Sequence, residues 1–142
     1  STAEISKSEL TKIKSIRKRT GEVLPFDLDV ISGAVAKAFE VTLEGGEGET
    51  KVVTDSVFKS LLKLREEVVN QNKKAIFLPT VEVVQDLVEK ELMKKGFPET
   101  AKKYILYRNK RSELRATFGP VPESIRLAVV ESSKYISSTY SE

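Results

Sequence analysis

The chain has 142 residues, of which 39% are hydrophobic and 32% charged, and its formal net charge is only +3. It contains no cysteine and no histidine, which excludes disulfides, thiolate nucleophiles, imidazole bases and Cys/His zinc sites. The length suits one domain with a single modest core. The apolar runs are too short to span a membrane, and no signal-peptide pattern is visible. We therefore expect a cytoplasmic binding protein that contacts no membrane, rather than an enzyme.

The N-terminal part predicts a tail followed by a β-hairpin. Residues 1–11 are polar and unpatterned, and we expect them to form a flexible tail. The stretch TKIKSIRKR then alternates roughly with period two around Ile13 and Ile16, which favours a strand. A Thr-Gly turn and the run EVLPF follow, so the pattern predicts a hairpin. Pro25 restricts its second strand to an edge or a strand end.

Two amphipathic helices are predicted next. From Asp27, a suitable N-cap, the hydrophobic period becomes that of a helix. The glycine- and glutamate-rich segment 42–50 reads as a solvated loop. A second helix should therefore begin at about Thr54 or Asp55 and carry a broad apolar stripe.

The second half of the chain predicts a strand and two more helices. The apolar run KKAIFLP, ended by Pro79, is typical of a third strand, and Thr80 can cap the helix after it. Pro98 suits the first turn of a fourth helix, and a last helical pattern lies in ESIRLAVVESSKYI. The predicted fold is α+β but mainly α: a four-helix bundle capped by a small three-stranded β-sheet lid.

Two basic clusters are candidates for anion binding. Arg17, Lys18 and Arg19 are crowded at the hairpin turn, and the run YRNKRSELR lies on the fourth helix. Together with the helix N-terminus at Asp27, they could bind a phosphate-rich ligand. On spacing alone, ordinary solvated charges are the favoured explanation of such basic runs, and a simple capping role for Asp27 is favoured over a ligand contact. The glycines at 45–48 lack the Lys-Ser/Thr ending of a P-loop.

A family resemblance bears on this choice. The stretch IRKRTGEVLPFDLDVISGAVAKAF resembles the opening of an ATP-cone, the regulatory nucleotide-binding module of ribonucleotide reductases. TVEVVQDLVEKELMKKG and AKKYILYRNKRSELR resemble its downstream motifs. The resemblance implies a nucleotide-binding domain over residues 12–117, with 118–142 as a linker and helix leading toward a catalytic domain that this sequence lacks.

The resemblance also implies a ligand and a site. ATP or dATP, with Mg²⁺, would bind as an allosteric ligand between the hairpin lid and the helices, with no catalytic residue and no metal-ligating side chain. Ile16 would line the base pocket, and Asp27 would lie near the base or sugar. Many family members carry a lysine where this chain has Val30, so one phosphate contact is missing or is supplied by another residue. The other implied nucleotide-binding residues are Lys18, Arg19, Thr80, Gln85, Lys110 and Arg111.

The function implied by the resemblance is allosteric. Nucleotide binding would control the overall activity of a ribonucleotide reductase through a change of conformation or assembly. The partners would be the reductase's catalytic domain or subunit, and a homo-oligomer could form when dATP binds. The main alternative is a small nucleic-acid-binding domain that uses the basic hairpin and helix, and a ligand-free protein-interaction bundle comes third.

Overall fold

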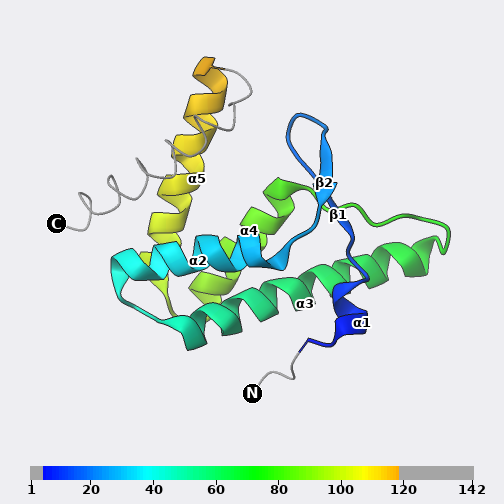
Figure 1. Ribbon diagram of the computed structural model, residues 1–142, viewed down its shortest axis with the longest axis horizontal. Helices are drawn as coiled ribbons and strands as arrows, with labels where there is room; N and C mark the ends of the chain where they lie inside the picture. Colours follow the sequence, from blue (N-terminus) through cyan, green and yellow to red (C-terminus); the bar gives the residue numbers. More distant parts are fainter. Residues whose placement is uncertain (1–4, 119–142) are drawn as a thin grey trace.

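The computed structural model describes residues 5–118 of the chain. A short helix and a two-stranded hairpin precede four longer helices (Figure 1). The elements in order are α1 (Lys7–Leu10), β1 (Ser15–Arg17), β2 (Val23–Pro25), α2 (Leu28–Thr42), α3 (Glu47–Gln71), α4 (Val81–Lys94) and α5 (Pro98–Phe118). The expected α+β fold, mainly helical, is therefore confirmed.

The four long helices form a ring of neighbours. Helix α2 packs on α3 and α5, and α4 packs on the same two helices. Figure 1 shows that α5 runs steeply across the direction of α3, and the hairpin lies over the opposite end of the helices. The helices therefore cross one another, in contrast to the nearly parallel packing of a regular bundle.

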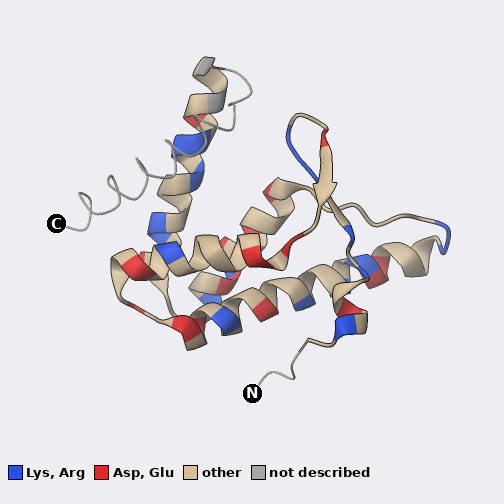
Figure 2. Ribbon diagram, viewed as in Figure 1, with Lys and Arg blue, Asp and Glu red and all other residues tan. Residues whose placement is uncertain are grey.

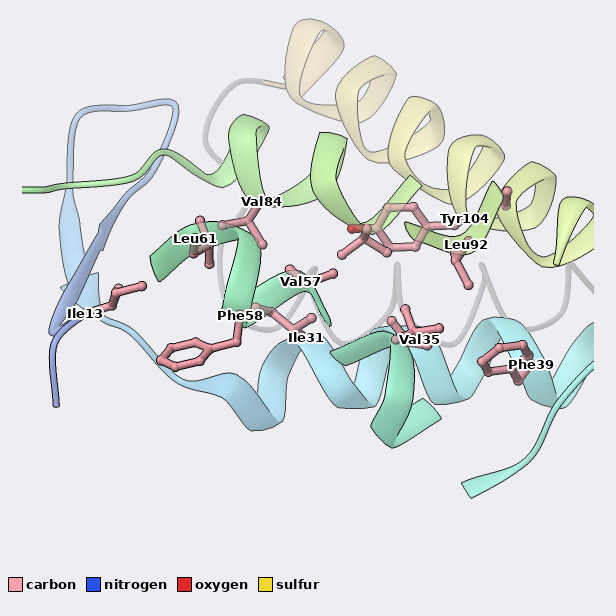
Figure 3. Close-up of a cluster of buried hydrophobic side chains, with 13 residues drawn as sticks. Ile13, Ile31, Val35, Phe39, Val57, Phe58, Leu61, Val84, Leu92 and Tyr104 are labelled. Carbon is pink, nitrogen blue, oxygen red and sulfur yellow. The ribbon is translucent and has the colours of Figure 1, made fainter. Parts of the chain in front are cut away.

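Apolar side chains from every long helix meet in one core (Figure 3). Ile13, two residues before β1, is only 2% exposed and joins this core, so the base of the hairpin is anchored in the helical body. The Phe26 ring, just after β2, lies 5.9 Å from the Phe58 ring. Truncating a side chain as fully buried as Phe58 typically costs about 3–5 kcal/mol. The core includes Val35, Phe39, Val57, Phe58, Leu61, Val88, Leu92 and Tyr104.

The predicted third strand is wrong. Within residues 5–118 the sheet has two strands, and the segment before α4 meets β1 only at an isolated bridge between Arg17 and Thr80. The physical reason lies at the end of that segment. Pro79 has no N–H to donate to a ladder, and Thr80 already turns the backbone into α4 as its N-cap.

Two predicted irregular segments contain helix. Helix α3 begins at Glu47, because the Glu49 carboxylate accepts the Gly46 N–H over 2.8 Å and acidic groups favour a helix N-terminus. In the predicted tail, Ser6 and Glu9 form a capping box that begins α1. The last predicted helix, within 118–142, lies outside the described residues.

Candidate functional site

The hairpin tip is a tight turn that carries basic side chains. The Lys18 N–H donates to the Glu22 carbonyl over 2.8 Å, and the Gly21 N–H donates to the Lys18 carbonyl over 2.9 Å. Gly21 has a φ of +91°, which glycine adopts without strain. The Lys18 ammonium also lies 3.5 Å from the Glu22 carboxylate. The turn therefore fixes the backbone from which Lys18 and Arg19 project.

Strand alternation separates the side chains of β1. Ile16, opposite Leu24 on β2, is half-buried and packs against the core. Arg17 is exposed. Because successive side chains on a strand point to opposite faces, Lys18 continues the Ile16 face and Arg17 lies on the other.

The hairpin is joined by its backbone to the start of α4. The Arg17 N–H donates to the Pro79 carbonyl over 2.9 Å, beside the bridge to Thr80. The Thr80 hydroxyl caps α4 by accepting the Val83 N–H over 3.2 Å. A helix N-terminus, with its partial positive charge, therefore lies next to the basic hairpin.

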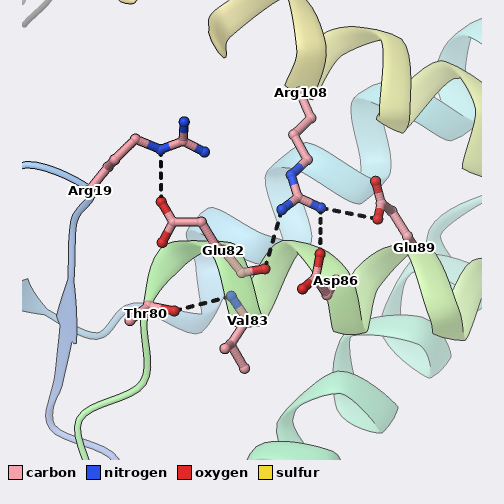
Figure 4. Close-up of polar contacts among 7 residues, drawn as sticks. All are labelled: Arg19, Thr80, Glu82, Val83, Asp86, Glu89 and Arg108. Atoms are coloured by element: carbon pink, nitrogen blue, oxygen red, sulfur yellow. Dashed lines mark hydrogen bonds and ion pairs between the residues drawn. The ribbon is translucent and has the colours of Figure 1, made fainter.

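Arg19 reaches across to this helix (Figure 4). Its Nε donates to the Glu82 Oε1 over 3.0 Å. Among the described residues, the Arg19 guanidinium makes no other hydrogen bond. Figure 4 shows its two terminal nitrogens directed away from Glu82. The pair is partly solvated, with Arg19 50% and Glu82 32% exposed.

Arg108 ties α5 to the same face of α4. Its Nη1 donates to Asp86 over 2.7 Å and to Glu89 over 3.0 Å, and its Nη2 lies 3.5 Å from the Glu82 carbonyl oxygen. Partial burial disfavours the charged guanidinium, but the Asp86 hydrogen bond and the Glu89 charge outweigh it and raise the pKa of Arg108. Arg108 is therefore a structural cation whose Nη1 donates to two carboxylates of α4.

The two predicted phosphate contacts on α5 have local partners. The Lys110 ammonium lies 3.8 Å from Glu113, and the Arg111 guanidinium lies over the Tyr107 ring at 5.9 Å from its centroid. Both Lys110 and Arg111 follow Arg108 within the next helical turn. Tyr104, on the same helix, is buried in the core.

Of the remaining predicted positions, Asp27 and Val30 lie at the start of α2, and Gln85 lies on α4. Asp27 is the N-cap and accepts the Asp29 N–H over 2.9 Å, so its capping role is confirmed. Val30, in the first turn of α2, is 69% exposed, although exposure of an apolar side chain to water is unfavourable. Gln85 lies half-buried on α4.

The fold brings part of the predicted set together. Lys18 and Arg19 lie beside Thr80, because the hairpin is bonded to the start of α4. Among the described residues, no hydrogen bond or ion pair joins Asp27 or Gln85 to them. The sequence interpretation missed Glu82. The pattern that could have indicated Glu82 is the spacing of Glu82, Asp86 and Glu89, which places three carboxylates on one face of a helix.

A separate groove lies between α2 and α3, away from the hairpin tip. It contains none of the predicted contacts, and its charged lining is mostly acidic: Asp29, Glu40, Glu47 and Asp55 against Lys51. Carboxylates repel phosphate, so this groove is not a candidate for a triphosphate.

The described charges are mixed in sign. Figure 2 shows basic and acidic residues interspersed along the ribbon, with basic residues on the hairpin and α5 and acidic residues on α4. Within residues 5–118, no group of three or more side chains could hold a metal ion. None of the helices in that range has the length and apolarity to cross a bilayer.

Comparison with known proteins gives a family match. The model of a family described as the ATP cone domain matches residues 14–113. The alpha subunit of ribonucleoside-diphosphate reductase from Chlamydia pneumoniae is 40% identical over 108 residues, which cover 75% of this chain and 10% of that protein.

Two vitamin B12-dependent ribonucleoside-diphosphate reductases are also similar. The protein from Thermoplasma acidophilum is 36% identical over 108 residues, covering 72% of this chain and 12% of its own length. The protein from Mycobacterium tuberculosis is 31% identical over 104 residues, covering 70% and 13%. The chain thus spans about a tenth of the length of these curated relatives.

Proposed function

The chain belongs to the ATP-cone family, and from this premise we propose that it is an allosteric domain that binds ATP or dATP under the hairpin. Bound nucleotide would control the overall activity of a ribonucleotide reductase. The observation that carries the proposal is the junction of the basic hairpin tip with the capped N-terminus of α4. Charge-assisted donors and a helix N-terminus together suit a triphosphate.

The proposed contacts divide by chemistry. Lys18 and Arg19 bind phosphate oxygens, with Lys110 or Arg111 from α5 as a further cation. Ile16 lines the base pocket, while Asp27, Thr80 and Gln85 supply polar contacts. Val30 cannot bind phosphate, so this chain relies on its other cations. Magnesium would enter with the triphosphate, because the described side chains include no metal-binding group.

Regulation requires more than binding. ATP and dATP differ at one sugar hydroxyl, so they can drive different outcomes only through different affinities for two states of the protein. We propose that those states differ in conformation or assembly with the reductase catalytic domain or subunit, and that dATP favours a homo-oligomer. The chain itself would perform no turnover.

Calorimetric titration of the 142-residue chain with ATP, dATP, dGTP and a DNA duplex tests this function. We expect saturable binding of both adenine nucleotides and weaker binding of dGTP, which shares the triphosphate but not the base. Binding of the duplex alone, with a steep loss as salt rises, would support the nucleic-acid alternative instead. Light scattering in the same samples measures assembly.

A further inference from the structure

Glu82 holds Arg19 in an unusual way for a surface ion pair. The carboxylate contacts Nε over 3.0 Å, at the inner edge of the guanidinium. Two-pronged binding to the terminal nitrogens would instead consume the donors best suited to a phosphate. In Figure 4 those terminal nitrogens point away from Glu82 and from the hairpin ribbon, toward the side on which Arg108 is drawn.

Hydrogen bonds to neighbouring groups fix the backbone around Glu82. It lies in the first turn of α4, next to Val83, whose N–H is capped by Thr80. Its carbonyl oxygen lies 3.5 Å from Nη2 of Arg108, which Asp86 and Glu89 fix in place. The anchor for Arg19 is thus a rigid helix end braced by α5, whereas Arg19 projects from a turn.

Resting on the proposed function, we propose that Glu82 is a positioning residue for the triphosphate site. It fixes the Arg19 guanidinium through Nε, so that both terminal nitrogens remain available to clamp phosphate oxygens. A side chain oriented before binding loses less conformational freedom when the ligand arrives. Glu82 touches no phosphate in this scheme, and its negative charge faces the part of Arg19 that points away from the ligand.

In the alternative scheme, Glu82 competes with the phosphate for Arg19, and its removal would change affinity in the opposite direction. A carboxylate that merely occupied the phosphate position would have to be displaced, and removing it would tighten binding. The geometry favours positioning, because Glu82 leaves the terminal nitrogens unoccupied. Both partners are partly solvated, so the effect is expected to be moderate.

The test compares Glu82→Ala and Glu82→Gln in dATP titrations of the full chain. Alanine removes the acceptor and should weaken dATP binding by about three- to tenfold. Glutamine keeps an oxygen that can accept the Nε–H while losing the charge, and should bind within about twofold of the wild type or tighter. In an Arg19→Ala background, Glu82→Ala should have no further effect, as coupled residues require. Glu66→Ala, an exposed change of equal charge on α3, is the control.

The outcomes separate the two proposals. Tighter binding by both Glu82 variants would overturn positioning in favour of competition. If Glu82→Ala weakens dATP binding equally in the wild type and in the Arg19→Ala background, the positioning proposal is also overturned, since Glu82 would then act through another group. If the wild type binds no adenine nucleotide, the proposed function fails and this inference with it. Thermal melts of each variant show that the differences in affinity do not reflect unfolding.

Discussion

Thr100 donates both its backbone N–H and its hydroxyl to one oxygen of Glu44, each over 2.6 Å. Glu44 lies between α2 and α3, and Thr100 lies in the first turn of α5 and is fully buried. The single hydroxyl proton of Thr100 goes to Glu44, so Thr42, 2.6 Å away, is the donor in their contact. One carboxylate therefore joins the α2–α3 connection to the start of α5.

We predict that Glu44→Ala lowers the free energy of unfolding by about 1–3 kcal/mol, because it leaves buried donors of Thr100 without an acceptor. The loss should depend on pH. Partial burial opposes ionisation, but the hydrogen bonds from Thr100 outweigh it and lower the pKa of Glu44. A lowered folded-state pKa gives stability that is present above the unfolded-state pKa and lost as pH falls through the folded value.

Urea unfolding of wild type and Glu44→Ala at neutral pH and at several acidic values measures this effect. The difference should narrow below the ordinary carboxyl range, about pH 4. Glu44→Gln keeps an acceptor without a titrating charge, so its stability relative to alanine should not follow pH in that range. A wild-type advantage that persists unchanged in acid would contradict the role of the carboxylate.

Arg108 should matter mainly for stability, because its guanidinium contacts carboxylates and a backbone carbonyl of α4. Its side chain is 19% exposed and neutralises Asp86 and Glu89, so Arg108→Ala leaves two carboxylates unpaired on one helix face. Asp86 is largely solvated, which reduces the penalty, and we expect a loss of about 1–2 kcal/mol in unfolding free energy. Arg108→Lys should recover part of it. Equal urea midpoints for wild type and alanine would show that the pairs contribute nothing.

The hairpin cations should be unequal in nucleotide binding. Charge-assisted hydrogen bonds contribute about 1.5–3 kcal/mol, so Lys18→Ala or Arg19→Ala should weaken dATP binding by about one to two decades. Arg17→Ala is the matched control: its side chain lies on the other face of β1, and its backbone bond to Pro79 survives the change. Calorimetry that finds Arg17→Ala as damaging as Lys18→Ala would place the phosphates on the opposite face.

Adenine nucleotide should raise thermal stability. A ligand that binds only the folded state adds about 2.7 kcal/mol at one hundred times its dissociation constant. Differential scanning fluorimetry with millimolar ATP or dATP, with and without magnesium, measures the shift in melting temperature. An unchanged melting temperature in every condition would contradict nucleotide binding.

The bound nucleotide should not be hydrolysed. The chain has no histidine and no P-loop, and the carboxylates near the hairpin tip, Glu22 and Glu82, pair with Lys18 and Arg19. A phosphate-release assay with purified protein should therefore remain at background. Sustained magnesium-dependent release, abolished by Arg19→Ala, would contradict this expectation.

Local signals in the sequence predicted most of the fold. The spacing of the hydrophobic residues predicted the four long helices. Asp27 and Thr80 are the N-caps of α2 and α4, as their side chains predicted. The start of α3 was placed too late because Gly46 and Gly48 resemble loop residues, whereas the capping contact of Glu49 stabilises a helix there. The prediction of a third strand was wrong because Pro79, at the end of that segment, has no N–H to donate to a neighbouring strand.

These local signals could not predict contacts between residues that are far apart in the sequence. Arg19 and Glu82 are 63 residues apart, and neither periodicity nor spacing indicates that they meet. The basic run on α5 could be recognised, but the use of Arg108 by Asp86 and Glu89 depends on how α4 and α5 cross. The proposed contacts of Lys18, Arg19 and the other cations with a nucleotide stay predictions until titrated.

The unequal attachment of the hairpin has a kinetic consequence. Ile13 and Phe26 fix its base among core side chains, while its tip is tied to α4 by the Arg17 backbone bond and the Arg19 ion pair. We expect releasing those two ties to cost about 1–3 kcal/mol, which would leave roughly 0.6–16% of molecules with an open tip. Loop motions of this kind take nanoseconds to microseconds. A nucleotide bound under the hairpin, as proposed, would therefore enter and leave without waiting for the core to unfold, and the contacts it makes with the closed tip would set its residence time.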